Sequence, residues 1–236
     1  EGTPVTGLER RGGRFELAAG AARVRAEQVL VATNAYTRDL PFSPPRIVVP
    51  LWITLAETEP VAPDRLAATG WTRGAGIYTQ HLILESYRPT ARGTIVFGSR
   101  RPQAQRGPVG TRRPEHGVVA DIVRGFRERF PSLDDVAISR AWGGWIAMTP
   151  SWLPAAGEIE PGLFYAVGYN GHGLAQAPYV GSLVADRMSG SAPSEDLGVV
   201  WRDGARFLPS PVFSAPALRL GWSLDRAADR LAARRG

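Results

Sequence analysis

The chain has 236 residues, of which 44% are hydrophobic, and this length and composition suit one large globular domain or two small ones. It contains no cysteine, which excludes disulfides, thiolate metal sites, a cysteine nucleophile and a cysteine-linked cofactor, and we expect no metal site. No stretch approaches the roughly 18 consecutive apolar residues of a membrane-spanning helix, and no secretory signal peptide is visible. We therefore expect a cytoplasmic protein without a membrane span.

The net charge is +6, and all 28 basic residues are arginine. Arginine suits phosphate contacts, so one hypothesis is an arginine-rich nucleic-acid binder, whose affinity would fall steeply with salt. The arginines, however, are scattered from end to end with Asp and Glu between them, and no nucleic-acid-binding motif accompanies them. We interpret the bias as genomic base composition and expect no nucleic-acid partner.

The first quarter of the chain is typical of β-structure. Glycines separate three short strand candidates, which are Val5–Arg11, Arg14–Ala18 and Ala22–Ala26. Gln28–Thr33 contains a continuous apolar run of the kind that is buried on both faces in a parallel sheet. Ile47–Thr58, rich in Val, Ile, Leu and Trp, predicts a further strand.

The middle of the chain combines short strands with one helix. Strands are expected at Ile77–Tyr78, Leu82–Arg88, Thr94–Gly98 and Val136–Trp142. Glu115–Phe130 is the clearest amphipathic helix, because apolar residues recur every four positions on one face. These residues are Val118, Ile122, Phe126 and Phe130.

The last part of the chain returns to alternating strands and helices. Residues 143–162 are expected to be loops and turns, Leu163–Gly168 a short buried strand and Leu174–Met188 a helix. A proline-rich tail is expected over residues 191–222, followed by a short helix over Leu224–Arg235. The order indicates that one domain is inserted into another. We divide the chain into residues 1–45, 46–142, 143–190 and a C-terminal tail at 191–236.

Three stretches carry the functional signal. They are "VLVATNAYT" at 29–37, "RAWGGWIAMTPSWLPAAGEI" at 140–159 and "GLFYAVGYNGHGLAQAPYVGSLVAD" at 162–186. Together, in this order and spacing, they resemble the D-amino-acid/glycine oxidase (DAO) superfamily of FAD-dependent amine oxidoreductases. The resemblance implies an α/β (α+β) fold, with an incomplete FAD-binding Rossmann-like domain that carries an inserted antiparallel-sheet substrate domain.

The resemblance also implies which residues contact FAD. In the family, a strand ending in Ala-Thr-Asn-Ala lies near the dinucleotide, a Trp-x-Gly segment returns to the flavin, and a Gly-x-x-Gly-His-Gly turn opens a helix beneath the ring. The matching residues here are Ala32, Thr33, Asn34, Trp142, Gly143, Gly144, Gly168, Asn170, Gly171, His172, Gly173 and Leu174.

The turn has suitable physical chemistry for this role. Gly171 and Gly173 have no Cβ, so a flat ring can approach their backbone. A helix N-terminus carries about half a positive charge and would stabilise the anionic edge of a reduced flavin, to which His172 adds a hydrogen bond or charge. The simpler interpretation is a tight turn with a solvated histidine.

Comparison with the related sarcosine oxidases limits the substrate. The position matching Gly144 is a cysteine there that attaches the flavin, so we expect FAD that is not linked through cysteine. The lysine that binds the substrate carboxylate is matched by Ala175, and the chain has no lysine to promote reaction with oxygen. An acceptor other than oxygen therefore stays open. Substrate contacts are expected from Tyr78, His81, Tyr87 and Arg88, with Arg88 on the carboxylate or simply on the strand surface.

The resemblance implies oxidation of a small amine or amino acid by hydride transfer to flavin N5. That chemistry needs no active-site base, so no catalytic residue is assigned. The family begins with a strand–GxGxxG–helix fingerprint, which this chain lacks. We therefore expect the C-terminal portion of such an enzyme, inactive alone, with a Rossmann segment absent or on a separate subunit. The alternative is a non-catalytic, subunit-like partner that needs a separate Rossmann chain to bind FAD.

Overall fold

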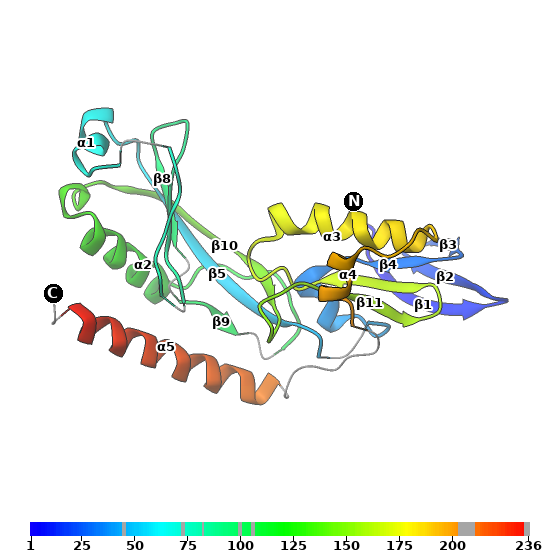
Figure 1. Cartoon of the computed structure of the whole chain (residues 1–236). Helices are drawn as coiled ribbons and strands as arrows, with labels where there is room; N and C mark the ends of the chain where they lie inside the picture. Colours follow the sequence, from blue (N-terminus) through cyan, green and yellow to red (C-terminus); the bar gives the residue numbers. More distant parts are fainter. Residues whose placement is uncertain are drawn as a thin grey trace. The chain divides into compact units, whose positions relative to one another are not determined.

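The structure is a computed structural model that describes residues 1–43, 46–71, 74–81, 83–98, 101–104, 107–202 and 211–233 (Figure 1). The chain forms two compact units. Unit 1 comprises Glu1–Leu51, Gln105–Val109 and Trp145–Phe213, and unit 2 comprises Trp52–Ala104, Gly110–Gly144 and Ser214–Gly236. The sequence had suggested divisions at 45/46 and 142/143 and a separate C-terminal tail at 191–236, whereas residues 191–213 group with unit 1 and residues 214–236 with unit 2.

Unit 1 contains two small sheets. The first is the antiparallel sheet of β1 (Val5–Arg11), β2 (Arg14–Ala19) and β3 (Ala22–Ala26), which closely follows the three predicted strands. The second has the order β11-β12-β4, with β11 (Ala155–Glu160) antiparallel to β12 (Leu163–Val167) and β12 parallel to β4 (Val29–Val31). A 3-10 helix, η1 (Asn34–Asp39), follows β4.

The central strand β12 is buried on both faces, as the apolar sequence of Leu163–Val167 predicts. On one face Leu163, Tyr165 and Val167 join the core formed with the first sheet. On the other face Phe164 and Ala166 pack beneath α3 (Gly173–Met188) and α4 (Glu195–Val200). Figure 1 shows α3 along this face of the sheet. The helix is therefore held by the strand that leads into it.

Unit 2 is built on a sheet with the order β10-β5-β8-β7-β6, to which β9 adds beside β5. The strands are β5 (Val49–Thr58), β6 (Ile77–Tyr78), β7 (Ser86–Pro89), β8 (Ile95–Gly98), β9 (Gln103–Ala104) and β10 (Ile138–Met148). The helices are α1 (Pro63–Ala68), α2 (His116–Arg129), the 3-10 helix η2 (Pro131–Leu133) and α5 (Pro211–Ala233). The strands β5 and β10 both extend into unit 1.

The predicted amphipathic helix is confirmed as α2. Its four predicted core residues are all buried, with exposed fractions from 0% at Phe126 to 8% at Phe130, the residue that caps the helix. Phe126 stacks on Phe97 of β8 with ring centroids 4.5 Å apart, and Tyr87 and Phe130 surround the pair. Aromatic packing therefore joins α2 to the sheet of unit 2.

Two predictions of irregular structure were wrong. Residues 143–162 contain the end of β10 and all of β11, because the glycines there permit close packing: a Cβ at Gly143 would lie 2.6 Å from the carbonyl oxygen of Ile53. The expected tail over 191–222 contains α4 and the start of α5, which opens on Pro211, a residue suited to the first helical turn. In the described residues, none of the helices combines the length and hydropathy needed to cross a membrane.

Candidate functional site

The parallel strands β4 and β12 end side by side in unit 1, with Val31 opposite Tyr165. From these ends the chain continues as Ala32–Asn34 after β4 and as Gly168–Gly173 after β12. We call the second segment, Gly168–Gly173, the carboxyl-end loop. Ligands of open α/β sheets bind outside the carboxyl ends of parallel strands. These strand ends therefore bring together the stretches at 29–37 and 162–186 that the sequence singled out.

Gly168 opens the carboxyl-end loop and is fixed by two asparagine side chains. Its N–H donates to Oδ1 of Asn34 at 3.1 Å, and its carbonyl oxygen accepts from Nδ2 of Asn170 at 2.7 Å. Its φ of +78° lies in the left-handed region, and a Cβ would come closer than 3.0 Å to Cγ2 of Thr149. Glycine is thus required here by backbone conformation and by packing.

Asn170 is buried, and each of its polar groups has a partner. Oδ1 accepts the backbone N–H of Thr149 at 2.8 Å, while the Asn170 N–H donates to the carbonyl of Ala147 at 3.0 Å. Its own carbonyl accepts from Nδ1 of His172 at 3.1 Å. Since a carbonyl only accepts and an N–H only donates, the side-chain amide has one possible orientation. Asn170 therefore ties the loop to the end of β10.

Left-handed backbone conformations gather at this end of unit 1. The residues are Asn34 with φ 46°, Trp152 with φ 59°, Gly168 with φ 78°, Asn170 with φ 52° and Gly171 with φ 88°. Asparagine tolerates this region better than most residues, whereas tryptophan in it is uncommon. Such conformations cost free energy and cluster at ligand sites, so the geometry itself marks this region as a functional candidate.

The start of α3 lies open next to the loop. Its N-cap is His172, which makes no side-chain capping bond, so the first-turn amides keep their partial positive charge. A Cβ on Gly171 would meet nothing nearer than Ile146 Cδ1 at 3.9 Å, and Leu174 is 96% exposed. Because Nδ1 of His172 donates to a carbonyl, Nε2 is the nitrogen that an outside ligand can reach.

Exposed apolar side chains follow Asn34 and Thr149, two residues that bond to the loop, closely in the sequence, and they are not among the predicted site residues. Tyr36 follows Asn34 by two residues and is 53% exposed, and Trp152 is 54% exposed. Leu153, 41% exposed, accepts at its carbonyl from the Thr149 hydroxyl at 2.6 Å. The Thr-Pro turn within "AMTPSW" was a usable signal for Thr149, but no sequence pattern marks the left-handed conformation at Trp152.

The third stretch, residues 140–159, is divided between the units: residues 140–144 lie on β10 in unit 2, and residues 145–159 belong to unit 1. Gly143 packs against its neighbouring strand, since a Cβ there would also lie 2.6 Å from the Trp52 ring. Gly144 is exposed, and a Cβ on it would meet nothing within 4 Å. Trp142 is partly buried, with the Arg140 guanidinium 5.1 Å from its ring centroid. Gly143 thus has a packing role, whereas Gly144 presents bare backbone.

The four predicted substrate residues separate into different surroundings. Tyr78 pairs with Ser86, and side chains alternate along β7, so Tyr78 and Arg88 lie on one face of the sheet while Tyr87 lies on the other. Tyr78 and Arg88 are exposed, whereas Tyr87 is 3% exposed inside the core. His81 is partly buried, with Nδ1 2.7 Å from the hydroxyl of Thr79. Tyr87 and Arg88 therefore do not share one surface.

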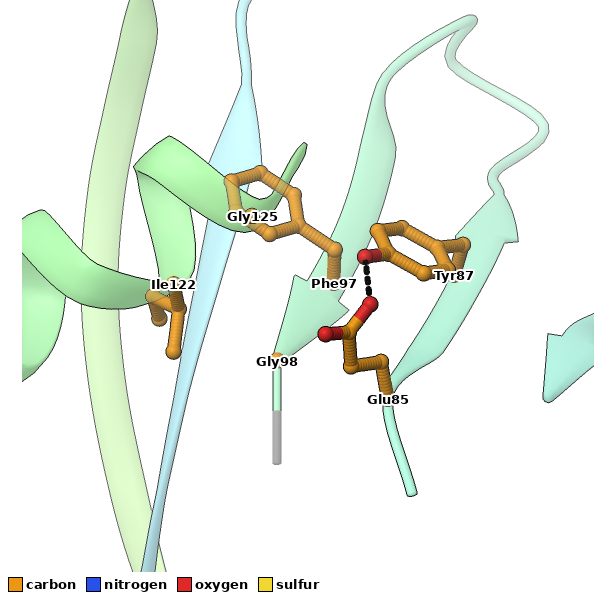
Figure 2. A pocket seen from close by; sticks show the side chains of 6 residues that line it. All are labelled: Glu85, Tyr87, Phe97, Gly98, Ile122 and Gly125. Atoms are coloured by element: carbon orange, nitrogen blue, oxygen red, sulfur yellow. Dashed lines mark hydrogen bonds between the residues drawn. The ribbon is translucent and has the colours of Figure 1, made fainter. Parts of the chain in front are cut away.

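The polar group of Tyr87 belongs to a buried network (Figure 2). Its hydroxyl donates to Glu85 at 2.5 Å, and Arg129 of α2 lies 3.1 Å from the same carboxylate. Burial, followed by the bond to Glu85, raises the pKa of Tyr87 well above its usual range. The adjoining cavity of about 10 Å³ has room for about one water molecule, which is too little for an amine substrate. Its lining residues are Glu85, Tyr87, Phe97, Gly98, Ile122 and Gly125.

No group of three or more His, Cys, Asp or Glu residues suited to a metal ion occurs in the part of the chain that the structure describes. The chemistry available at the carboxyl-end loop is therefore that of backbone amides, a histidine and apolar surface. These groups are suited to a flat, electron-rich ligand with one apolar face.

Known proteins similar to this chain are oxidoreductases. The sequence profile of the DAO family, described as "FAD dependent oxidoreductase", matches residues 1–187. A probable oxidoreductase OrdL from Haemophilus influenzae is 30% identical over 194 residues, covering 80% of this chain and 42% of that protein. A gamma-glutamylputrescine oxidoreductase from Escherichia coli is 28% identical, covering 74% of this chain and 39% of that protein. The chain thus spans less than half the length of these relatives.

Solved structures agree on the fold. Glycine oxidase from Geobacillus kaustophilus superposes with a TM-score of 0.73 at 19% identity, covering 88% of this chain and 53% of that chain. L-proline dehydrogenase from P. horikoshii superposes with a TM-score of 0.68 at 24% identity, covering 81% and 51% respectively. The predicted α/β fold class of the flavin-dependent amine oxidoreductases is confirmed.

Proposed function

This chain belongs to the DAO family of FAD dependent oxidoreductases, and from that premise we propose that it forms the flavin-ring side of an enzyme that oxidises an amine or amino acid. The supporting observation is the open start of α3 beside the carboxyl-end loop. The loop presents Gly171 without a Cβ and His172 without a capping bond. We propose that the pyrophosphate end of FAD is held by residues outside this sequence, on the same polypeptide or on a separate subunit.

The residues present fit a flavin ring. A flat ring needs a backbone surface without side chains, and a Cβ on Gly171 would occupy the open space above the loop. A flat ring also needs apolar neighbours, and the exposed residues Tyr36 and Leu174 closely follow Asn34 and Gly173 in the sequence. When bound, FAD supplies a two-electron acceptor for the hydride leaving the substrate carbon.

The chain itself supplies electrostatics and orientation. The amides at the start of α3 place partial positive charge where an anionic ring edge is stabilised, and His172 Nε2 adds a hydrogen-bonding group. Backbone contacts from Ala32, Thr33 and Gly173 remain part of the proposal. So do contacts from Trp142, Gly143 and Gly144 on β10. Attachment of FAD through cysteine is excluded within this chain, which has none.

For the substrate, we propose an amine or an amino acid. Where the substrate carries a carboxylate, we propose that Arg88 binds it. This guanidinium is exposed on the same sheet face as Tyr78, and within the described part of the chain it forms no ion pair. Tyr87 is the weaker candidate, because its hydroxyl is already bonded to Glu85 in the core. His81 stays a candidate beside Thr79.

The decisive experiment titrates the purified chain with FAD and with lumiflavin, which carries the ring without the pyrophosphate arm. We expect the chain to quench the fluorescence of both flavins. Anaerobic loss of visible absorbance on addition of an oxidisable amine or amino acid is expected only when the residues that hold the pyrophosphate end of FAD are supplied as well. Adding oxygen afterwards shows whether it serves as acceptor. Absence of lumiflavin binding would overturn the proposal and favour a non-catalytic, subunit-like partner.

A matched pair of variants locates the ring. Gly171 and Gly190 lie near opposite ends of α3, both have left-handed φ values, 88° and 84°, and neither has a neighbour that a Cβ would strike. Gly171→Ala and Gly190→Ala therefore impose similar backbone strain. We expect about tenfold weaker lumiflavin binding for Gly171→Ala and no change for Gly190→Ala, because the added methyl occupies the ring's position only at Gly171. Equal effects in both variants would place the ring elsewhere.

A further inference from the structure

We propose that Asn170 is a positioning residue, which holds the carboxyl-end loop in the one conformation that presents the start of α3 to a ligand. This inference rests on the proposed function only in taking that ligand to be a flavin ring. That Asn170 fixes the conformation of the loop follows from its hydrogen bonds, and this part of the proposal can be tested without any cofactor.

The side chain of Asn170 joins two segments that the sequence separates by about twenty positions. Nδ2 donates to the Gly168 carbonyl at 2.7 Å, while Oδ1 accepts the Thr149 N–H at 2.8 Å. The Thr149 hydroxyl lies 3.3 Å from both side-chain atoms. One side chain therefore sets the distance between the end of β10 and the first residue of the loop.

The main chain of Asn170 fixes the other side of the loop. Its N–H donates to the Ala147 carbonyl at 3.0 Å, and its carbonyl accepts from the His172 ring at 3.1 Å. The residue stands directly before Gly171 and two positions before the N-cap of α3. Any rotation of Asn170 would therefore move the amides of Gly171 and Gly173 that face the proposed ligand.

Asparagine meets all the requirements at this position, whereas glycine and aspartate do not. A φ of 52° favours glycine, asparagine or aspartate. The two side-chain contacts need an acceptor for Thr149 and a donor for Gly168. Glycine offers neither group, and an ionised aspartate offers only acceptors, so its second oxygen would face the Gly168 carbonyl without a proton between them.

Asn34 provides the matched control. It is also left-handed, with φ 46°, and it contacts the same glycine, but only as an acceptor from the Gly168 N–H at 3.1 Å. Asn34→Asp therefore keeps its bond, whereas Asn170→Asp loses one. Both variants add one negative charge beside Gly168, so the difference between them isolates the donor bond from the effect of charge.

The experiment measures amide hydrogen exchange of a peptide covering Gly168–Leu174 in the full chain, together with the dissociation constant for lumiflavin. For Asn170→Asp we expect exchange and dissociation constant both to rise about tenfold or more, as for loss of a buried hydrogen bond. For Asn34→Asp we expect exchange to change by less than about threefold, since the acceptor is retained, and a smaller loss of lumiflavin affinity than in Asn170→Asp, since Asn34 is itself a proposed flavin contact.

Three outcomes decide the matter. Unchanged exchange in Asn170→Asp would overturn the proposed hold on the loop. Faster exchange with equal loss of lumiflavin affinity in both variants would assign the affinity change to charge and overturn the positioning role. If the unmodified chain binds no lumiflavin while Asn170→Asp still loosens the loop, the flavin proposal fails and the hold of Asn170 on the loop stands.

A second variant keeps the test valid if Asn170→Asp does not fold. Asn170→Gly preserves the left-handed backbone and removes the side chain, leaving the Thr149 N–H and the Gly168 carbonyl to water. We expect the same direction of change in exchange and in lumiflavin affinity. Exchange as slow as in the unmodified chain would show that the backbone alone fixes the loop, which contradicts the proposal.

Discussion

The carboxyl-end loop of unit 1 and the helix-covered sheet of unit 2 both bury polar side chains, but they use different chemistry. At the loop, the neutral side-chain amides of Asn170, which is part of it, and of Asn34, which follows β4, bond to main-chain groups of Gly168. In unit 2, the buried carboxylates of Glu57 and Glu85 bond to arginines and hydroxyl groups. Neutral amides fix a backbone without adding charge, which leaves the partial positive charge at the start of α3 available to a ligand.

The comparison therefore separates two kinds of stability. Unit 2 depends on side-chain volume, above all on the rings around Phe126, and on ion pairs that join strands and helix. The loop depends on left-handed backbone conformations that its glycines and asparagines adopt at low cost. Substitutions that test volume, conformation and charge should affect the two regions differently.

The largest effect is expected from Phe126→Ala. The ring is fully buried and stacks on Phe97 at 4.5 Å, so its removal should lower the free energy of unfolding by about 3–5 kcal/mol. Urea denaturation measures the loss, and exchange should rise first in peptides from α2 and β8. The exposed neighbour Arg127 is the control, because Arg127→Ala should change stability by less than about 0.5 kcal/mol. Similar losses in both variants would remove the distinction drawn for unit 2.

A smaller effect is expected from Gly168→Ala. The left-handed φ costs an alanine about 1–2 kcal/mol, and the clash with Thr149 adds about 1–3 kcal/mol. Gly190→Ala carries a similar φ penalty without a clash, so it should lose only about 1–2 kcal/mol. Thermal unfolding of the two variants side by side measures the difference. If they are equally stable, packing against Thr149 does not constrain the loop.

The smallest effect at neutral pH, and the sharpest in its pH dependence, is expected from Glu57→Gln. The hydrogen bond from Thr94 at 2.5 Å, with further bonds from Arg140 and Arg92, lowers the pKa of Glu57 below its usual value of 4.5. A lowered pKa contributes stability that is present above 4.5 and is lost as the pH falls through the folded-state value.

The unmodified chain should therefore exceed Glu57→Gln in stability at pH 7, and the gap should narrow in acid. Denaturation midpoints at pH 7 and at progressively lower pH measure this gap. The side-chain amides of Asn34 and Asn170 do not titrate, so the hydrogen bonds that they make to Gly168 should not follow the pH dependence of Glu57. A constant gap at all pH values would show that the charge of Glu57 contributes nothing to the fold.

Much of the fold was predictable because its signals are local. The apolar run of β12, the four-residue spacing on α2 and the glycine breaks between β1, β2 and β3 all act within one element. The failures were non-local. The sequence around Gly143 predicts a loop. Gly143 nevertheless lies within β10, because the absence of a Cβ leaves room for the ring of Trp52 on a neighbouring strand.

The candidate site divides in the same way. The stretches around Asn34 and Gly171 were recognisable because their order in the chain resembles one family, and the family assignment agrees. The substrate-binding residues were harder to predict from the sequence, because neighbouring residues such as Tyr87 and Arg88 alternate between the buried and the exposed face of the sheet. No local pattern states which face is buried, since that depends on where α2 packs.

By itself, the sequence determined the family, the fold class and the lack of thiol chemistry, and it predicted the glycines on which a flat ligand would rest. Only the tertiary structure decided what holds those glycines in place. The bonds from Asn170 to Gly168 and to Thr149 cross between segments that are distant in the chain. A side chain's need for one donor and one acceptor becomes visible only when the fold brings its partners within hydrogen-bonding distance.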